Sequence, residues 1–226
     1  MQNIIARLKS QLAQQSLQGL ALDIDETLSY TNGYWIEQMQ ALFGNPEQLS
    51  IQETIEKYRY THRVPYWQTA ESTQWMEEQR HSNAAQECLP LIENADLCVN
   101  IIHRTLPIVL YATIRPEEVK RGTSTWLKKH GFPEAEILAR PAEVPYEEGN
   151  RWKAQAIAEL FPQVVGIVDD NPEMLAYLPA EYQGTVFLYN SHSTSYPKGA
   201  FRVLHCSDWP SVCQHVDILG NAGLPD

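Results

Sequence analysis

The sequence has few basic residues, few cysteines and no long apolar run. Lysine and arginine together number 17, against 28 aspartate and glutamate residues, and the formal net charge is -11. A protein that binds a nucleic-acid polymer normally presents a basic face, so we do not expect this class of partner. The four cysteines contain no Cys-x-x-Cys pair, and we expect them to be reduced thiols.

Two further absences concern membranes and export. No run approaches the eighteen or so consecutive apolar residues that mark a membrane-spanning helix, and the first residues lack the apolar segment of a signal peptide. We therefore expect a cytoplasmic protein with no membrane partner. Hydrophobic residues make up 43% of the 226 residues and charged residues 20%, which is enough for a packed core. The length predicts one α/β domain with a sizeable insertion, or two small domains.

Short apolar runs alternate with helical patterns along most of the chain. The runs, which we predict to be strands, span residues 19–22, 106–112, 136–139, 164–168, 185–189 and 202–206. Helical patterns cover residues 1–16, 34–42, 89–104, 116–130, 151–160 and 209–216. Strands that alternate with helices predict an α/β fold with a doubly wound, mostly parallel, Rossmann-like sheet.

The sequence predicts one buried face and two starting residues for these helices. In the helix 89–104 we expect Leu97, Ile101 and Ile102 to form the apolar face. Pro116 is followed by two glutamates and is predicted to start its helix. Asn150 is predicted to cap the helix that follows it.

Residues 31–88 contain few β-rich runs and predict a helical insertion after the first strand, with a core formed by 1–30 and 89–226. Aromatic and basic residues are concentrated in one stretch of it: Tyr58, Tyr60, His62, Arg63, Tyr66 and Trp67. Such residues can bind a ring-bearing phosphate. The more ordinary interpretation is that they form the core of the insertion and its solvated edge.

Polar residues follow three of the predicted strands. Asp23 and Asp25 come after the first strand, Thr113 after the second, and Asp169 and Asp170 after 164–168. Buried charges are costly, so packing gives no reason to end a core strand on acids, although they also cap turns. The carboxyl ends of parallel strands meet at one edge of a sheet, where ligands bind. These residues therefore indicate a metal site, an acid–base pair or a nucleophile.

In order and strand context, these motifs resemble those of the haloacid dehalogenase superfamily, in its phosphatase branch, over residues 20–30 and 90–190. The resemblance implies that Asp23 is a nucleophile that forms an aspartyl-phosphate, and that Asp25 is a general acid and then a base. It implies that Thr113 and Lys153 hold the phosphoryl group. It also implies a Mg²⁺ site, formed by Asp23, Asp169, Asp170 and the backbone carbonyl of Asp25.

Several alternatives stay open within this resemblance. Lys120 is a rival of Lys153 as the phosphate-binding lysine, and Glu173 is a rival of Asp170 as the second acid of the fourth motif. Arg115 either contacts the substrate or simply begins a helix. The helix predicted to start at Pro116 would direct free backbone N–H groups toward an anion. The seven histidines show no metal-ligand spacing, and none is assigned a catalytic role.

The resemblance implies a Mg²⁺-dependent phosphohydrolase that acts on a small phosphorylated metabolite. A carboxylate that attacks a phosphate dianion needs a cation to offset charge repulsion, which agrees with the implied residues. The insertion would be a cap that closes over the site and contacts the leaving group. A dehalogenase is disfavoured, because dehalogenases lack an acid at the position of Asp25. A phosphomutase on the same core, and a catalytically weak binding or regulatory protein, are the alternatives. The sequence predicts neither the particular substrate nor the oligomeric state.

Overall fold

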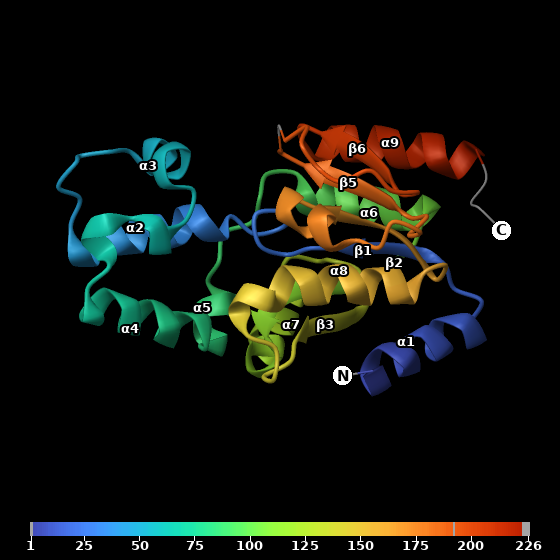
Figure 1. Ribbon diagram of the computed structural model, residues 1–226, viewed down its shortest axis with the longest axis horizontal. Helices are drawn as coiled ribbons and strands as arrows, with labels where there is room; N and C mark the ends of the chain where they lie inside the picture. Colours follow the sequence, from blue (N-terminus) through green and yellow to red (C-terminus); the bar gives the residue numbers. More distant parts are fainter. Residues whose placement is uncertain (1, 192, 223–226) are drawn as a thin grey trace.

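A six-stranded sheet runs through the computed structural model, which describes residues 2–191 and 193–222 (Figure 1). The strands are β1 (Gly19–Leu22), β2 (Ile108–Pro116), β3 (Glu136–Arg140), β4 (Val164–Asp169), β5 (Thr185–Tyr189) and β6 (Arg202–Cys206). They are hydrogen-bonded in the order β3-β2-β1-β4-β5-β6, and all five neighbouring pairs are parallel. The predicted α/β fold with a doubly wound, Rossmann-like sheet is confirmed.

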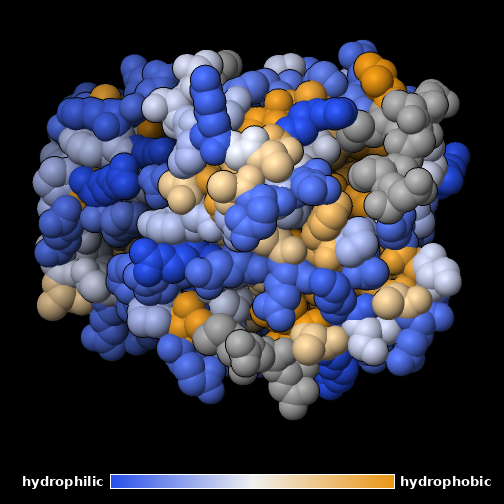
Figure 2. Space-filling model, turned by 45° about the vertical axis from the view of Figure 1, so that its right-hand side comes forward, coloured by the Kyte–Doolittle hydropathy of each residue, from blue (hydrophilic) through white to orange (hydrophobic). Residues whose placement is uncertain are grey.

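Nine α-helices accompany these strands in the described part of the chain. They are α1 (Gln2–Gln14), α2 (Thr31–Phe43), α3 (Ile51–Tyr58), α4 (Ala70–Arg80), α5 (Asn83–Glu87), α6 (Ala95–Thr105), α7 (Lys120–Lys129), α8 (Gly149–Leu160) and α9 (Trp209–Ala222). None of these described helices combines the length and the apolar character that crossing a lipid bilayer requires. On the face shown in Figure 2, hydrophobic residues lie in several separate groups among hydrophilic ones.

Strand β1 lies inside the sheet, and all four of its residues are buried. Its side chains alternate between two hydrophobic clusters. Leu20 and Leu22 pack in one cluster with residues of α6, α7 and α9, whereas Ala21 packs in the other with residues of α1 and α8. A strand covered by helices on both faces has no solvent side, which explains why its sequence is a continuous apolar run.

The strand order places β1 and β4 side by side, although one begins near residue 19 and the other near residue 164. The chain leaves β1 toward β2 on one side, and it later returns on the other side through β4, β5 and β6. In doubly wound sheets the crevice at this reversal, outside the carboxyl ends of the strands, is the usual binding place. The residues that follow β1 and β4 therefore lie at the edge of the sheet where such folds bind ligands.

Helices α2, α3 and α4 of the insertion lie together at one end of the molecule, on the left in Figure 1. They have a small hydrophobic cluster of their own, which contains Ile36, Met39, Val64 and Trp67. The short helix α5 packs against α7 instead. The Gly122 N–H donates to Asn83 Oδ1 (2.6 Å), and a Cβ on Gly122 would lie 2.3 Å from the Asn83 carbonyl oxygen. The division into core and cap at residues 31 and 88 stays a prediction.

The apolar face predicted for α6 is wrong at two of its three positions. Leu97 is 62% exposed and Ile101 is 50% exposed, whereas Ile102 is buried. The buried face consists of Ala95, Cys98, Val99 and Ile102. These residues follow the i, i+3, i+4, i+7 spacing of a helix face. Two of them, Ala95 and Cys98, are less hydrophobic than Leu97 and Ile101, so hydrophobicity alone predicts the wrong face.

Two predicted helix starts also need correction. Pro116 does not begin a helix: it ends β2 with φ -65° and ψ 147°, and a 3₁₀ turn at Glu117–Val119 precedes α7. The fixed φ of proline suits an extended strand end as well as a helix start. Asn150 is not a cap, because α8 begins at Gly149, directly after a 3₁₀ turn at Tyr146–Glu148.

Candidate active site

Asp23 lies directly after β1 and is 4% exposed. Its backbone N–H donates to the carbonyl oxygen of Val168 in β4 (2.9 Å), which holds the two strand ends together. Its Oδ1 atom accepts a hydrogen bond from Nζ of Lys153 (2.9 Å), a buried residue of α8. Burial opposes the charged form of Lys153, but the carboxylates of Asp169 and Asp23 outweigh it and raise its pKa. Helix α8 thus delivers an ammonium group to the end of β1.

Two further carboxylates, those of Asp169 and Asp170, lie beside the Asp23–Lys153 pair. Asp169 ends β4 and Asp170 follows it, and one oxygen from each of Asp23, Asp169 and Asp170 lies within 4.8 Å of the other two. Lys153 Nζ also forms an ion pair with Asp169 Oδ2 (2.7 Å). Asp169 Oδ1 accepts a hydrogen bond from the Asn171 N–H (2.9 Å). The structure therefore brings together the carboxylates that the sequence placed after two different strands.

These carboxylates carry more negative charge than one lysine can offset. Burial raises the pKa of Asp23 to about 7; the charge of Lys153 opposes this shift, and that of Asp169 adds to it. Burial and the charge of Asp23 also raise the pKa of Asp170 well above its usual range. Buried, closely spaced carboxylate oxygens of this kind are the ligands that Mg²⁺ takes in proteins. The residues present therefore fit a divalent cation.

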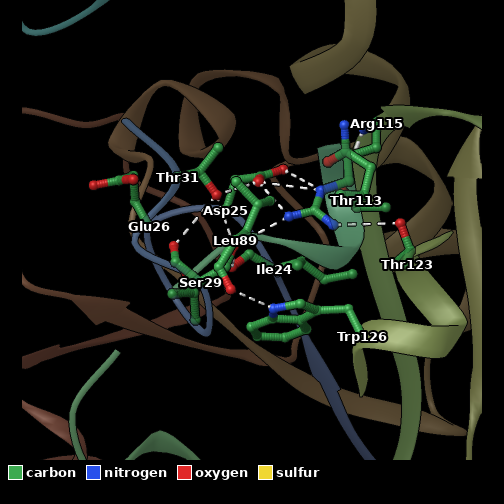
Figure 3. A network of polar contacts seen from close by, with 12 residues as sticks. Ile24, Asp25, Glu26, Ser29, Thr31, Leu89, Thr113, Arg115, Thr123 and Trp126 are labelled. Atoms are coloured by element: carbon green, nitrogen blue, oxygen red, sulfur yellow. Dashed lines mark hydrogen bonds and ion pairs between the residues drawn. The ribbon is translucent and has the colours of Figure 1, made fainter. Parts of the chain in front are cut away.

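Asp25 is held by a different cation, Arg115 (Figure 3). Nη2 of Arg115 donates to Asp25 Oδ1 (2.6 Å), and Nε lies 3.1 and 2.9 Å from the two carboxylate oxygens. The Thr31 hydroxyl also donates to Oδ1 (2.6 Å). Burial disfavours the charged form of Asp25, but the charge and hydrogen bonds of Arg115 outweigh it and lower the pKa. Asp25 is therefore a carboxylate in the resting protein at neutral pH.

Arg115 is itself fixed in place, and its side chain is 5% exposed. Nη1 donates to the Thr123 hydroxyl of α7 (3.3 Å), and Nη2 donates to the Ser29 hydroxyl (3.1 Å). Sequence reasoning left open whether Arg115 contacts a substrate or only begins a helix. It begins no helix, and it forms a buried ion pair with Asp25 at the wall of a cavity.

Arg115 reaches the site because β2 is irregular near its end. Thr113 pairs with Ala139, and Pro116 pairs with the very next residue, Arg140, so three steps along β2 match one step along β3. A bulge of this kind changes the direction in which side chains point. Proline has no N–H to donate, so within a sheet it is confined to edges, strand starts and bulges. Pro116 is therefore the signal by which the sequence could have revealed this feature.

The N-terminus of α2 also points at the carboxylates. The Asn32 N–H donates to Glu26 Oε1 (2.6 Å), and Thr31, the first residue of α2, binds Asp25. The helix dipole favours negative charge at this position. Burial raises the pKa of Glu26 to about 7, and its φ of 60° lies in the left-handed region that few glutamates adopt. We expected a helix starting at Pro116 to present its N–H groups here, but α2 does so instead.

The remaining predicted site residues are placed as follows. Thr113 is fully buried, its Oγ1 accepts a hydrogen bond from the Arg115 N–H (3.1 Å), and it is not among the residues that line the cavity. Lys120 pairs with Glu136 (2.5 Å) at the surface, so Lys153 is the lysine beside Asp23. The side chain of Glu173 is 51% exposed and lies 3.8 Å from Arg59 of the insertion, so Asp170 is the acid that joins the cluster.

A cavity of about 610 Å³ lies between the core and the insertion. Asp23, Asp25, Lys153 and Asp170 line it from the core. Of the aromatic and basic stretch in the insertion, only Tyr60, His62 and Arg63 line the cavity. Trp67 is 3% exposed and packs in the cluster of the insertion, where its Nε1 donates to the Gly44 carbonyl (3.0 Å).

Tyr58 and Tyr66 lie against that same hydrophobic cluster. The stretch therefore combines both predicted roles. One half packs the insertion, and the other half faces the space beside the carboxylates.

The fold and the site together define a doubly wound α/β protein with a buried carboxylate–lysine centre at the carboxyl edge of its sheet. No family model matches the chain, and no curated protein matches it.

Among the solved structures that are similar to it are two hydrolases. One is a HAD family hydrolase from Deinococcus radiodurans R1 with bound phosphate and sodium (14% identity, TM-score 0.47, covering 93% of this chain and 99% of the other). The second is a haloacid dehalogenase-like family hydrolase from Xanthomonas campestris (16% identity, TM-score 0.42, covering 92% and 99%). Both are described as hydrolases of the family whose motifs the sequence resembles. Similarity at this level carries no argument about function, which has to rest on the residues of this chain.

Proposed function

We propose that the protein is a Mg²⁺-dependent phosphohydrolase of the haloacid dehalogenase type, which acts on a small phosphorylated molecule through an aspartyl-phosphate at Asp23. One observation carries this proposal: the Lys153 ammonium group is buried between Asp23 and Asp169, beside Asp170. Such an arrangement has no stabilising purpose as a plain core, because three carboxylates around one lysine repel each other. It suits a site that receives a cation and a phosphoryl group.

The carboxylates of Asp23, Asp169 and Asp170, with the backbone carbonyl of Asp25, would hold the Mg²⁺ ion. When bound, the ion supplies positive charge that lowers the repulsion between a carboxylate nucleophile and a phosphate dianion. Lys153 supplies a second positive charge from the protein itself, at the Oδ1 atom of Asp23. The other oxygen of Asp23, Oδ2, has one distant hydroxyl neighbour, Thr27 at 3.5 Å. Oδ2 is the atom we assign as the nucleophile.

In the first step, Asp23 Oδ2 forms a bond to phosphorus while the bond from phosphorus to the leaving oxygen breaks. Asp25 takes up a proton from solvent when the substrate binds, and the leaving oxygen then takes that proton from Asp25. In the second step, Asp25 removes a proton from water, the water oxygen attacks phosphorus, and the acyl-phosphate bond breaks to release inorganic phosphate and Asp23. Lys153 holds the phosphoryl oxygens in both steps. Thr113 is fully buried outside the cavity lining, where its Oγ1 accepts the Arg115 backbone N–H (3.1 Å), so its contact with the phosphoryl group stays a prediction.

Three measurements test the proposal together. Removing divalent cations with a chelator should abolish hydrolysis of p-nitrophenyl phosphate, and Mg²⁺ should restore it. The Asp23→Asn variant should form no covalent phosphoenzyme, which mass spectrometry of the intact protein detects. The Asp25→Asn variant should still be phosphorylated slowly by p-nitrophenyl phosphate, because nitrophenolate leaves without protonation.

Full activity in metal-free protein would contradict the role of the cation. Identical behaviour of the two aspartate variants with this substrate would contradict the division of roles between them.

A further inference from the structure

The cavity is larger than a phosphoryl group needs. Its volume of about 610 Å³ is in the range of sites that enclose whole small molecules, so much of it is left for the leaving group. The core residues described above take up the phosphoryl side. The opposite wall comes from the insertion, and its chemistry determines which leaving group fits.

Three basic side chains from the insertion line this wall: His62, Arg63 and Arg80, which we call the basic corner. They act on one another electrostatically. Burial lowers the pKa of His62, and the charges of Arg63 and Arg80 lower it further. Glu77, Glu147 and Glu173 also line the cavity, but Glu77 is the one of these three that forms an ion pair with a described residue of the corner, Arg80.

Arg63 differs from the other cavity-lining cations in having no carboxylate partner among the described residues. Lys153 pairs with Asp23 and Asp169, Arg115 pairs with Asp25, and Arg80 pairs with Glu77. Arg63 is exposed and lies at the cavity lining, and it appears in no ion pair of the described chain, so its guanidinium is free for an external anion.

Each of the two arginines of the corner lies over an aromatic ring. The guanidinium carbon of Arg63 lies 5.1 Å from the centre of the Tyr60 ring, and that of Arg80 lies 4.5 Å from the centre of the Tyr146 ring. The ring of His62 also stacks on Tyr60, with centroids 5.5 Å apart. A guanidinium that contacts a ring through its face keeps its N–H donors available for a carboxylate or phosphate.

The same stacking argues against an aromatic leaving group. Arg59, Arg63 and His62 all lie against Tyr60, so little of its ring face remains for a base or another ring. Tyr146 is similarly approached by Arg80 and by Arg140. Trp35 also lines the cavity, but it is 9% exposed and packs against Tyr34 and Trp75, so this wall offers anionic hydrogen bonding more than ring stacking.

We infer that the substrate is a phosphate ester whose leaving group carries a second anionic group, bound by Arg63 of the basic corner. This inference rests on the proposed phosphohydrolase function and names its substrate class. The second anion is a carboxylate or another phosphate, because both match the donors of a guanidinium group.

Matched substrates test the inference. Glycerol 3-phosphate and 3-phosphoglycerate have nearly the same size, and only the second carries a carboxylate. Fructose 6-phosphate and fructose 1,6-bisphosphate give the corresponding comparison for a second phosphate. For at least one pair, kcat/KM should be ten times higher or more for the member with the second anion, since charge-assisted hydrogen bonds contribute that much or more.

Arg63→Met removes the charge and keeps a long side chain, and it should lower that preference about tenfold, mainly through KM. Arg63→Lys should restore part of it. Arg104→Met is the matched control, because Arg104 is an exposed arginine of α6 outside the cavity, and it should leave the preference unchanged. An unchanged preference in Arg63→Met, or equal losses on both members of each pair, would overturn the inference.

Binding separates this inference from the proposed function. Calorimetric titration of the Asp23→Asn variant with the same four compounds measures affinity without turnover. If the wild-type protein hydrolyses none of them but the variant still binds the doubly anionic members more tightly through Arg63, the proposed function fails and the anion site stands. If all four are hydrolysed and bound without preference, the proposed function stands and the anion site fails.

Discussion

Replacing Arg115 tests how firmly Asp25 is held. The Arg115→Met variant loses five donors and keeps a similar unbranched length, so the change removes charge more than volume. Asp25 would retain one hydrogen bond, from Thr31 (2.6 Å), and its carboxylate would lose the guanidinium that holds it from the opposite side. Ser29 and Thr123 would each lose a donor. We expect lower stability and a less well positioned catalytic acid.

The size of the loss follows from burial. Removing one partner of a buried ion pair costs about 3–5 kcal/mol, because the other charge is left unpaired. The Arg115 side chain is 5% exposed, but that of Asp25 is 28% exposed, so water can solvate the remaining carboxylate in part. We therefore expect a loss of about 2–3 kcal/mol. For a chain of this size, each kcal/mol lowers the Tm by about 2–4 °C, which gives a decrease of about 4–12 °C.

Urea denaturation of metal-free protein at neutral pH measures this loss, and a double-mutant cycle assigns it to the pair. In an Asp25→Asn background, Arg115→Met should cost at least about 1 kcal/mol less than it does alone. Arg115→Lys should recover only part of the loss, because an ammonium group cannot reproduce the paired donors of a guanidinium. Arg121→Met, which alters an exposed arginine of α7, should change stability by less than about 0.5 kcal/mol.

Turnover distinguishes positioning from stability alone. If Arg115 holds Asp25 in the orientation for proton transfer, Arg115→Met should slow hydrolysis of an alkyl phosphate about tenfold more than hydrolysis of p-nitrophenyl phosphate. The reasoning is refuted if the two substitutions add to within about 0.5 kcal/mol. It is also refuted if both substrates are slowed equally in a variant that is fully folded at the assay temperature.

Two further predictions concern the cation and the insertion. Asp170→Asn should raise the Tm of the metal-free protein, because it removes one of three crowded carboxylates. It should also abolish the stabilisation by Mg²⁺, which is about 2.7 kcal/mol in the wild type at one hundred times the Kd. If thermal denaturation shows the wild-type response to Mg²⁺ in this variant, the proposed cation site is wrong. Trp67→Ala should lower the free energy of unfolding, measured by urea denaturation, by about 3–5 kcal/mol and leave relative rates among substrates unchanged, because Trp67 packs the insertion and does not line the cavity. A change in substrate preference in folded protein would contradict this and place Trp67 in the binding wall.

The sheet and the meeting of the carboxylates could be predicted because both depend on strong, local signals. A four-residue apolar run followed by two acids is interpretable without knowing its neighbours, and the run at 164–168 repeats the pattern. Parallel strand order then brings the ends of β1 and β4 together. Lys153 was identified through the resemblance. A lysine on an amphipathic helix usually lies on the solvated face, but Lys153 lies on the buried face of α8. Leu97 and Ile101 were misassigned because exposed apolar residues are common, and hydrophobicity alone does not determine which face is buried.

The partner of Asp25 could not be predicted in this way, because it depends on where β2 ends. The sequence predicts that the strand ends at residue 112. With that boundary, Thr113 is the side chain at the strand end, and Pro116 is predicted to start a helix. In the structure β2 continues to Pro116, its pairing with β3 slips by two residues, and this bulge turns Arg115 onto Asp25. The same extension delays α7 behind a 3₁₀ turn, so α2 becomes the helix whose N-terminus meets the carboxylates. One strand boundary therefore determines both the ion pair and the helix that serve the site, and that boundary depends on pairing with a strand more than twenty residues away.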